Sequence, residues 1–277
     1  MATLFRWFAA APLWLLHAAG WLLGWLVFLA SATYRSHFLS NSKRAGYRFS
    51  AVRAAVGSAG KMVAELPRLW LGSAVVCEWD NDACVDQAYA NGKGVVFLTP
   101  HLGCFEVAAQ AVALRYSPQY GDLTVLYRPA RQSWLAELMA EARNRPGLQT
   151  APTTLTGVRQ MLRALRSGHA VGLLPDQVPP DGMGQWAAFF GRDAYTMTLA
   201  VRLAQQTGAT VLLSWGERLR CGLGYRLHFR PLAQPLEQDL GAATQQVNRE
   251  MERLIAECPG QYLWGYARYK HPHPDHG

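Results

Sequence analysis

The sequence of 277 residues offers little that would form a disulfide, bind a metal or hold a common cofactor. Its five cysteines are odd in number and include no C-x-x-C pair, so we expect them to be reduced and mostly buried, as in a cytosol-facing domain. No spacing typical of metal ligands, no P-loop and no dinucleotide-binding fingerprint is present. The histidine-rich tail after Lys270 could bind metal adventitiously, but a frayed terminus is the better explanation. We therefore expect neither metal nor cofactor.

Charged residues are also scarce, at 17% of the chain against 50% hydrophobic residues, which is apolar for a soluble enzyme. The charges that are present are unbalanced: 27 Lys and Arg against 19 Asp and Glu give a net charge of +8. A basic chain favours an anionic partner, such as nucleic acid, a phospholipid surface or an acidic carrier protein. Because no nucleic-acid recognition module is visible, we expect no nucleic-acid binding.

A long stretch without charge lies near the N-terminus. From Trp7 to Thr33 there is no Asp, Glu, Lys or Arg, and four tryptophans fall within it. About 20 such residues span a bilayer as a helix, and tryptophan favours the membrane interface. We predict that residues 1–33 form a membrane anchor, either spanning the bilayer or lying in its interface, and that residues 34–277 form the catalytic domain.

Two other interpretations of this stretch remain open. Ala30-Ser31-Ala32 resembles the cleavage site of a signal peptide, although the apolar run is long for one. A buried core helix would seldom carry four tryptophans. Positive residues follow the stretch closely, and because such residues stay on the cytoplasmic side, we expect the rest of the chain there. They are Arg35, Lys43, Arg44, Arg48 and Arg53.

Short apolar runs alternate with helical patterns along the rest of the chain. The predicted strands are Ala74–Trp79, Val95–Thr99, Leu123–Tyr127, Ala170–Leu174, Thr210–Trp215 and Tyr225–Arg230. The predicted helices lie near residues 50–70, 82–91, 104–115, 132–145, 154–167, 196–207 and 242–257. This alternation predicts an α/β fold in which helices flank a central, mostly parallel sheet.

The most informative stretch runs from Gly94 to Glu106. A predicted strand ends at Pro100, so His101 stands at the carboxyl end of the strand, where open α/β sheets bind ligands. Glu106 lies in the first turn of the next helix, from which its carboxylate can reach back to the imidazole. A histidine oriented by a carboxylate is the arrangement of a general base. A capping histidine or a reactive Cys104 thiol would be alternative interpretations.

Taken together, five motifs resemble a known family. His101 and Glu106, with four residues between them, match the H-x4-D/E signature of the glycerolipid acyltransferase superfamily. More narrowly, the chain resembles the bacterial lipid A late acyltransferases, the lauroyl and myristoyl transferase family. The further matching stretches are Leu126-Tyr-Arg128-Pro129, Leu174-Pro-Asp176-Gln177, Phe189-Phe-Gly191 through Thr196-Met-Thr198 to Thr207-Gly-Ala209, and Pro259-Gly-Gln-Tyr-Leu-Trp264 with Arg268-Tyr-Lys270. With the N-terminal stretch, the resemblance covers nearly the whole chain.

The chain departs from the family pattern at three places. Cys104-Phe105 stands where Asn-Trp is common, which removes an amide hydrogen-bonding group. Gly260 replaces a usual acidic residue, and Tyr266-Ala267 replaces a frequent His-Arg pair. These differences leave the acceptor and the chain length open rather than the reaction.

The resemblance implies a glycerolipid acyltransferase-like fold and an O-acyltransferase, with His101 as general base and Glu106 fixing its tautomer. The donor would be a thioester on acyl carrier protein. The acceptor would be a hydroxyl of a lipid A precursor at the cytoplasmic face of the bacterial inner membrane, in contact with its phospholipid. An enzyme acting on another glycolipid or aminolipid, or a non-catalytic lipid-binding scaffold, is the alternative.

Three further residues are implied in substrate binding. Arg128 follows a predicted strand, where a fixed cation could hold a phosphate or carboxylate, although a solvated surface arginine is also possible. Asp176 follows the run Val171–Leu174 and is expected at the same sheet edge, where it could pair with Arg128, bind the sugar or form a turn. Gln177 stands beside it. A helical stripe of Arg159, Arg163 and Arg166 could dock the acidic carrier or face the membrane.

Overall fold

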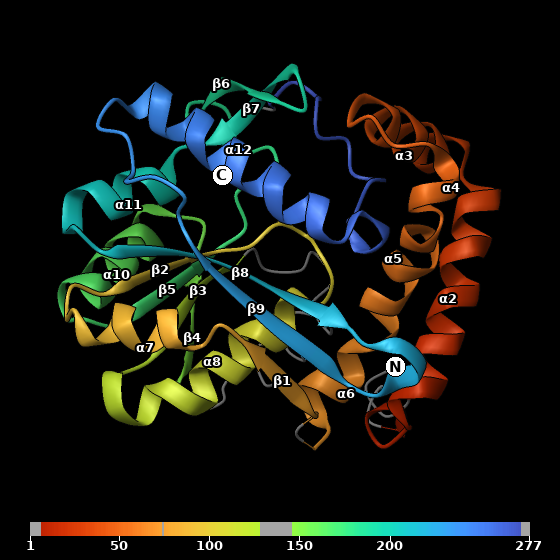
Figure 1. Cartoon of the computed structure of the whole chain (residues 1–277), viewed down its shortest axis with the longest axis horizontal. Coiled ribbons are helices and arrows are strands. Elements are labelled where there is room, and N and C mark those ends of the chain that lie inside the picture. The colour runs from red at the N-terminus through yellow and green to blue at the C-terminus, as the bar shows by residue number, and fades with distance from the viewer. Residues whose placement is uncertain (1–6, 74, 128–145, 273–277) are drawn as a thin grey trace.

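A seven-stranded sheet forms the centre of the molecule, of which the computed structural model describes residues 7–73, 75–127 and 146–272 (Figure 1). The strands are β1 (Cys77–Asp80), β2 (Val95–Leu98), β3 (Leu123–Tyr127), β4 (Leu148–Pro152), β5 (Ala170–Leu173), β8 (Thr210–Arg218) and β9 (Tyr225–Pro231). Their order is β1-β9-β8-β2-β5-β3-β4. Neighbours from β8 to β4 are parallel, whereas β9 runs antiparallel to β8. The predicted α/β fold with a mostly parallel sheet is confirmed.

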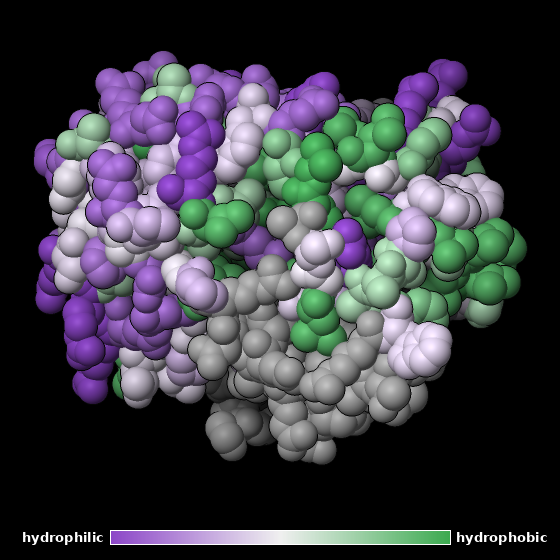
Figure 2. Space-filling view, turned by 90° about the horizontal axis from the view of Figure 1, so that it is seen from below, coloured by the Kyte–Doolittle hydropathy of each residue, from purple (hydrophilic) through white to green (hydrophobic). Residues whose placement is uncertain are grey.

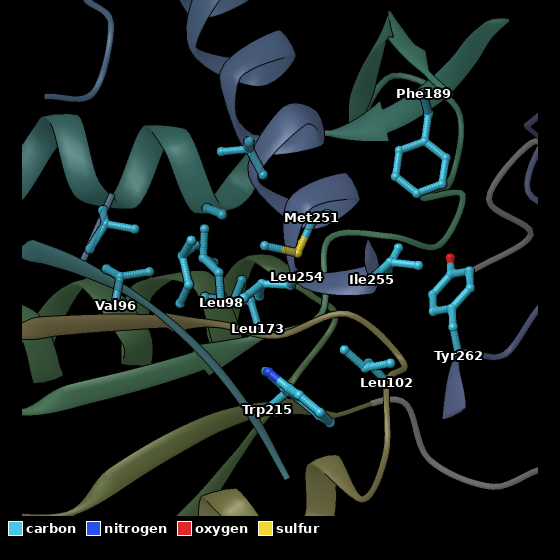
Figure 3. Close-up of a cluster of buried hydrophobic side chains, with 14 of the residues drawn as sticks. Val96, Leu98, Leu102, Leu173, Phe189, Trp215, Met251, Leu254, Ile255 and Tyr262 are labelled. Carbon is cyan, nitrogen blue, oxygen red and sulfur yellow. The ribbon is translucent and has the colours of Figure 1, made fainter. Parts of the chain in front are cut away.

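Helices cover both faces of this sheet because its central strands are apolar on both sides. Val95 and Phe97 of β2 pack with α7 (Ala83–Ala90) and α8 (Phe105–Tyr120), while Val96 and Leu98 face the other layer. That other layer consists of α10 (Leu155–Arg166), α11 (Leu199–Thr207) and α12 (Leu240–Glu257). Side chains of α12 and the sheet meet in one buried cluster (Figure 3). The all-apolar pattern of β2 thus produces a strand buried on both faces.

Some elements differ from the sequence prediction. The short strand β4 was not predicted; it is the edge strand beside β3 and alternates polar with apolar residues only weakly. An antiparallel hairpin of β6 (Gly184–Phe189) and β7 (Arg192–Met197) was also missed. Its turn places both Phe190 and Gly191 at positive φ. In the sequence, only the glycine indicates such a turn. The helix predicted at 132–145 lies outside the described residues.

The N-terminal region forms a layer of helices along one side of the molecule (Figure 1). These helices are α2 (Leu13–Ala30), α3 (Ala32–Arg44), α4 (Phe49–Val52), α5 (Ala54–Ala64) and α6 (Leu66–Leu71). Helices α2 and α5 approach each other through glycines: a Cβ on Gly24 would lie 2.2 Å from the Val56 carbonyl oxygen, and one on Gly60 would lie 1.9 Å from that of Gly20. Only glycine permits this close packing of two helix backbones.

Helix α2 has one face buried against the protein and one face exposed. Leu16 and Phe28 are buried, whereas Leu26 and Leu29 on the outer face are 64% and 67% exposed. Apolar side chains accordingly gather at the end of the molecule where α2 lies (Figure 2). Among the described residues α2 is the one helix long and apolar enough to cross a membrane, and 28% of it is buried. The predicted anchor is therefore a helix docked lengthwise on the domain.

A buried polar cluster joins α2 to the sheet. Glu65, at the junction of α5 and α6, accepts hydrogen bonds from Arg218 of β8 (2.6 Å), Tyr225 of β9 (2.9 Å) and the ring of His17 of α2 (3.0 Å). Burial alone would raise the pKa of Glu65, but the charge of Arg218 and the hydrogen bonds from His17 and Arg218 outweigh it and lower the pKa to about 2. The carboxylate therefore stays ionised inside the protein and holds three elements together.

Candidate active site

The candidate site is built by two neighbouring strands that end in the same way. In the parallel pair of β2 and β5, Leu98 lies opposite Leu173. Each of these leucines is followed by one residue, a proline and then a polar residue, which is His101 after β2 and Asp176 after β5. Because the two segments leave the sheet in register, they bring His101 and Asp176 together at its carboxyl edge, where α/β enzymes bind substrates.

The two residues are joined by two hydrogen bonds. The ring Nδ1 of His101 lies 2.7 Å from Oδ1 of Asp176, and the backbone N–H of His101 donates to Oδ2 at 2.9 Å. The second ring nitrogen, Nε2, lies 3.0 Å from the amide nitrogen of Gln177. One tautomer satisfies all three contacts: Nδ1 carries the proton and donates to Asp176, and Nε2 accepts from Gln177. A neutral imidazole with its lone pair on Nε2 is the form that accepts a proton from a hydroxyl.

The surroundings keep Asp176 ionised. Its side chain is 2% exposed, and burial by itself would raise its pKa. The charge of His101, the two hydrogen bonds that His101 donates and the charge of Arg268 outweigh burial, so that the pKa of Asp176 lies below its usual range. A fixed carboxylate behind Nδ1 can therefore stabilise the imidazolium that forms when Nε2 takes up a proton.

The structure corrects the partner predicted for His101. Glu106 was expected to orient the ring, but the carboxylate bonded to the ring is that of Asp176. The reason is the path of the chain between them: the N–H of Cys104 bonds to the Gly216 carbonyl at 2.7 Å and Leu102 pairs with Tyr262, which holds His101 over the end of β5. Glu106 is the second residue of α8, and its Oε2 accepts from the indole N–H of Trp70 at 3.5 Å.

Glu106 instead lines an apolar cavity of about 90 Å³ at the same sheet edge. The cavity lies between α8 and the strands β2, β3 and β5. Its walls comprise Phe97, Thr99, Phe105, Glu106, Ala108, Ala109, Val112, Leu123, Val125, Leu126, Gly172, Leu173, Leu174 and Ser214. The ring of Phe105 lies 5.1 Å from the ring of His101 and so connects this cavity to the histidine. An apolar cavity beside a base suits a ligand with a hydrocarbon chain.

The thiol of Cys104 does not have the environment of a nucleophile. The residue is 2% exposed and precedes the first turn of α8. Burial, together with the charge of Glu65, raises the pKa of the thiol well above its usual value. Since the thiolate is the reactive form, this cysteine is a structural residue of the loop after β2. The five cysteines of the chain are all unpaired, but the prediction that most of them are buried is wrong, since Cys104 alone is buried and Cys221 is exposed.

The remaining predicted residues lie in different places. Arg128 falls outside the described residues. Arg159, Arg163 and Arg166 are exposed on α10. Because α10 begins after the carboxyl end of β4 and ends before the start of β5, it leads away from the site. Arg166 therefore lies at the opposite sheet edge from His101.

One contributor to the site was not predicted individually. The segment after Pro259 packs against the loop after β2, with the N–H of Leu263 bonded to the His101 carbonyl at 3.1 Å. From the same segment, the hydroxyl of Tyr266 accepts a hydrogen bond from the N–H of Val178 at 3.0 Å. In the sequence, this segment was noticed only as one of the motifs that resemble the family. Nothing in the local pattern places residues 262–268 beside residue 101.

Comparisons with known proteins identify the family of the chain. The family profile of the bacterial lipid A biosynthesis acyltransferases matches residues 49–271. The chain is 25% identical over 185 residues to the lipid A biosynthesis palmitoleoyltransferase of Escherichia coli (strain K12), a match that covers 66% of this chain and 58% of that protein. It is 25% identical over 184 residues to the lauroyltransferase of the same organism, covering 65% and 58% of the two chains. It is 24% identical over 181 residues to a lipid A biosynthesis acyltransferase of Haemophilus influenzae, covering 65% and 55%.

The chain therefore belongs to the bacterial lipid A biosynthesis acyltransferase family, and the family-level resemblance is confirmed. The matched stretch spans less than two thirds of the length of these relatives.

Proposed function

We propose that the protein is an O-acyltransferase that moves a fatty acyl chain from a thioester to a hydroxyl of a lipid A precursor. The observation that carries the proposal is the hydrogen-bonded pair of His101 and Asp176, whose histidine ring contacts Phe105 in the wall of an apolar cavity. Family membership supports the substrate class.

In the proposed mechanism, the acceptor hydroxyl displaces the Gln177 amide from Nε2 of His101 and gives up its proton to that nitrogen. The hydroxyl oxygen forms a bond to the thioester carbonyl carbon, the carbon–sulfur bond breaks, and the proton passes from Nε2 to the leaving thiolate. Asp176 stabilises the transient imidazolium through its bond to Nδ1. No acyl-enzyme intermediate is needed, because the base acts directly on the acceptor.

Glu106 keeps a place in the proposed site, but with a different role from the one predicted. Its carboxylate belongs to the wall of the apolar cavity, which would take part of the acyl chain. We propose that it accepts a hydrogen bond from the acceptor lipid and so positions the reacting hydroxyl near Nε2. Such placement of a reactant is worth large rate factors in enzymes.

The proposed donor and location follow from the net charge and from helix α2. An acyl carrier protein is acidic, which suits the net charge of +8. The outer face of α2 is apolar and is followed by Arg35 and Lys43, an arrangement that favours the cytoplasmic face of the inner membrane. Contact with inner-membrane phospholipid follows from that placement.

The test is acyl transfer by the purified full chain in detergent or vesicles. The donor is acyl carrier protein that carries a radiolabelled acyl chain, and the acceptor is a lipid A precursor. Labelled product should form with wild type and fall by roughly 10²–10⁴ with His101→Ala, the usual worth of a positioned base. Absence of transfer by a folded wild type would favour the non-catalytic scaffold. Lipid analysis of a deletion strain identifies the acceptor: a missing acyl chain on a different glycolipid or an aminolipid would replace lipid A in the proposal.

A further inference from the structure

Two arginines from distant parts of the chain face the same tyrosine ring. The guanidinium carbon of Arg44, the last residue of α3, lies 5.1 Å from the centroid of the Tyr269 ring. That of Arg192, the first residue of β7, lies 5.2 Å from the same centroid. Beside them, the ammonium of Lys270 lies 5.5 Å from the ring of Tyr266. We refer to these five residues as the Tyr269 patch.

The three cations of the Tyr269 patch are exposed, and none of them has an ion-pair partner among the described residues, whereas Arg115, Arg226 and Arg230 each pair with a carboxylate. The nearby carboxylate of Glu252 accepts a hydrogen bond from the backbone N–H of Phe190 at 2.7 Å. Gathering unpaired positive charges costs repulsion, which an anionic ligand relieves. The arrangement therefore indicates a site for an anion.

The aromatic base of the Tyr269 patch is fixed in place. The hydroxyl of Tyr269 donates to the Phe189 carbonyl at 2.8 Å, and the hydroxyl of Tyr266 accepts from the backbone N–H of Val178 at 3.0 Å. Burial raises the pKa of Tyr269 to about 12, so the phenol stays neutral and adds no negative charge to the patch. A rigid platform lowers the entropy that the arginines lose when they bind a ligand.

The Tyr269 patch is continuous with the candidate active site. Val178, which contacts Tyr266, is two residues beyond Asp176, and Leu263 of the same C-terminal segment bonds to His101. Behind the patch lies the buried Arg268, which is 2% exposed and donates to the Tyr195 carbonyl at 2.7 Å and to the Thr196 hydroxyl at 2.6 Å. Its Nε is buried with no hydrogen-bond partner in the described part of the chain. This third guanidinium adds positive potential beneath the patch.

We propose that the Tyr269 patch binds a phosphate group on the headgroup of the acceptor lipid. Guanidinium groups bind phosphate through paired, charge-assisted hydrogen bonds, and two of them converge here. An amphiphilic ligand is indicated because the neighbouring surface notch combines apolar Leu39 and Phe49 with cationic Lys43 and Arg48. The proposal rests on the proposed function, since it assigns the patch to the acceptor rather than to the donor.

The test compares Arg44→Gln plus Arg192→Gln with a control that removes the same charge elsewhere, Arg202→Gln plus Arg226→Gln. Each protein is assayed with one lipid A precursor in its phosphorylated form and after phosphatase treatment. The patch variant should raise KM for the phosphorylated acceptor by about tenfold to a hundredfold, the usual worth of lost charge-assisted hydrogen bonds, with kcat little changed. With the dephosphorylated acceptor, the patch variant and wild type should have equal KM. The control should resemble wild type with both acceptors.

Other outcomes overturn the proposal. If KM of the patch variant rises by the same factor with both acceptor forms, the patch does not bind the phosphate. If its loss instead tracks weaker flotation on vesicles of anionic phospholipid, the patch binds the bilayer surface. Direct binding of the two lipid forms to wild type separates this proposal from the proposed function, because a preference for the phosphorylated lipid that the patch variant lacks would stand even without acyl transfer. The melting temperature of each variant shows that a loss is not due to unfolding.

Discussion

Replacing Asp176 with asparagine tests which carboxylate supports the histidine. Asparagine has the same shape but offers one oxygen and one NH₂ group in place of the two oxygens that accept from the N–H and the ring of His101. If the oxygen keeps the backbone bond, the NH₂ group faces Nδ1 and favours the tautomer whose proton is on Nε2. That tautomer cannot accept the proton of the acceptor hydroxyl. We therefore expect kcat to fall by roughly 10²–10⁴, as for other positioned bases and misoriented tautomers, with KM values nearly unchanged.

The assay is single-turnover acyl transfer at saturating donor, with Glu106→Gln as the matched variant. The ring of His101 bonds to Asp176 and Gln177, so the Glu106 variant should mainly raise KM for the acceptor and keep more of kcat. The reasoning would be refuted if Asp176→Asn kept wild-type kcat while Glu106→Gln lost a hundredfold or more. In that case Glu106 would become the partner of His101 in the reacting complex, as the sequence alone predicted.

Three further predictions follow from burial and charge. Glu65→Gln should destabilise the fold by roughly 3–5 kcal/mol, because it leaves a buried arginine without its counterion. Because the pKa of Glu65 is low, its contribution to the stability of the fold is present above the usual carboxyl pKa and is lost as the pH falls toward 2. Between about pH 5 and pH 3, the melting temperature of wild type should therefore drop more steeply than that of the variant. Leu26→Gln with Leu29→Gln should weaken sedimentation with vesicles while leaving the melting temperature within a few degrees, because both side chains point outward. Cys104→Ser should retain acyl transfer, since the buried thiol is not in its reactive form.

Each of these predictions has its own control. A double change to Glu65→Leu and Arg218→Met removes both charges, and it should recover much of the stability that the single change loses. Outward leucines remote from α2, Leu114 and Leu155, provide a matched pair for the vesicle experiment; equal losses from both pairs would mean that α2 is not a membrane contact. A Cys104→Ser protein that is folded but inactive would indicate that the thiol takes part in the reaction.

The fold was largely predictable because the central strands are short, apolar and well separated. The limits of β3 agree with the predicted strand, and those of β2 and β5 differ by one residue at the carboxyl end. The hairpin of β6 and β7 was missed because its strands are only partly buried and their polar residues obscure the alternation. What the sequence could not supply is register: it showed two strands followed by Pro-His101 and Pro-Asp176, but not that they lie side by side.

The sequence analysis named His101, Asp176 and Gln177, which the structure brings together, but it did not predict the hydrogen bonds between them. Glu106 is near His101 in sequence, which made it the natural partner, whereas Asp176 is 75 residues away and reaches the ring only through the pairing of β2 with β5. Similarly, the apolar pattern of α2 indicated a membrane helix but not its docked face. That face depends on glycines that meet α5, a segment more than thirty residues further on.

The buried cluster around Glu65 changes what it would mean to shorten this protein. Removing α2 to obtain a more soluble enzyme would do more than detach a membrane anchor, because it would uncover the glycine face of α5 and take His17 away from a buried carboxylate. The same strand that holds Arg218 also bonds through Gly216 to the loop that carries His101, so the damage would reach the candidate active site. Solubility is better sought by exchanging outward side chains such as Leu22, Leu26 and Leu29, which keeps the inner face intact.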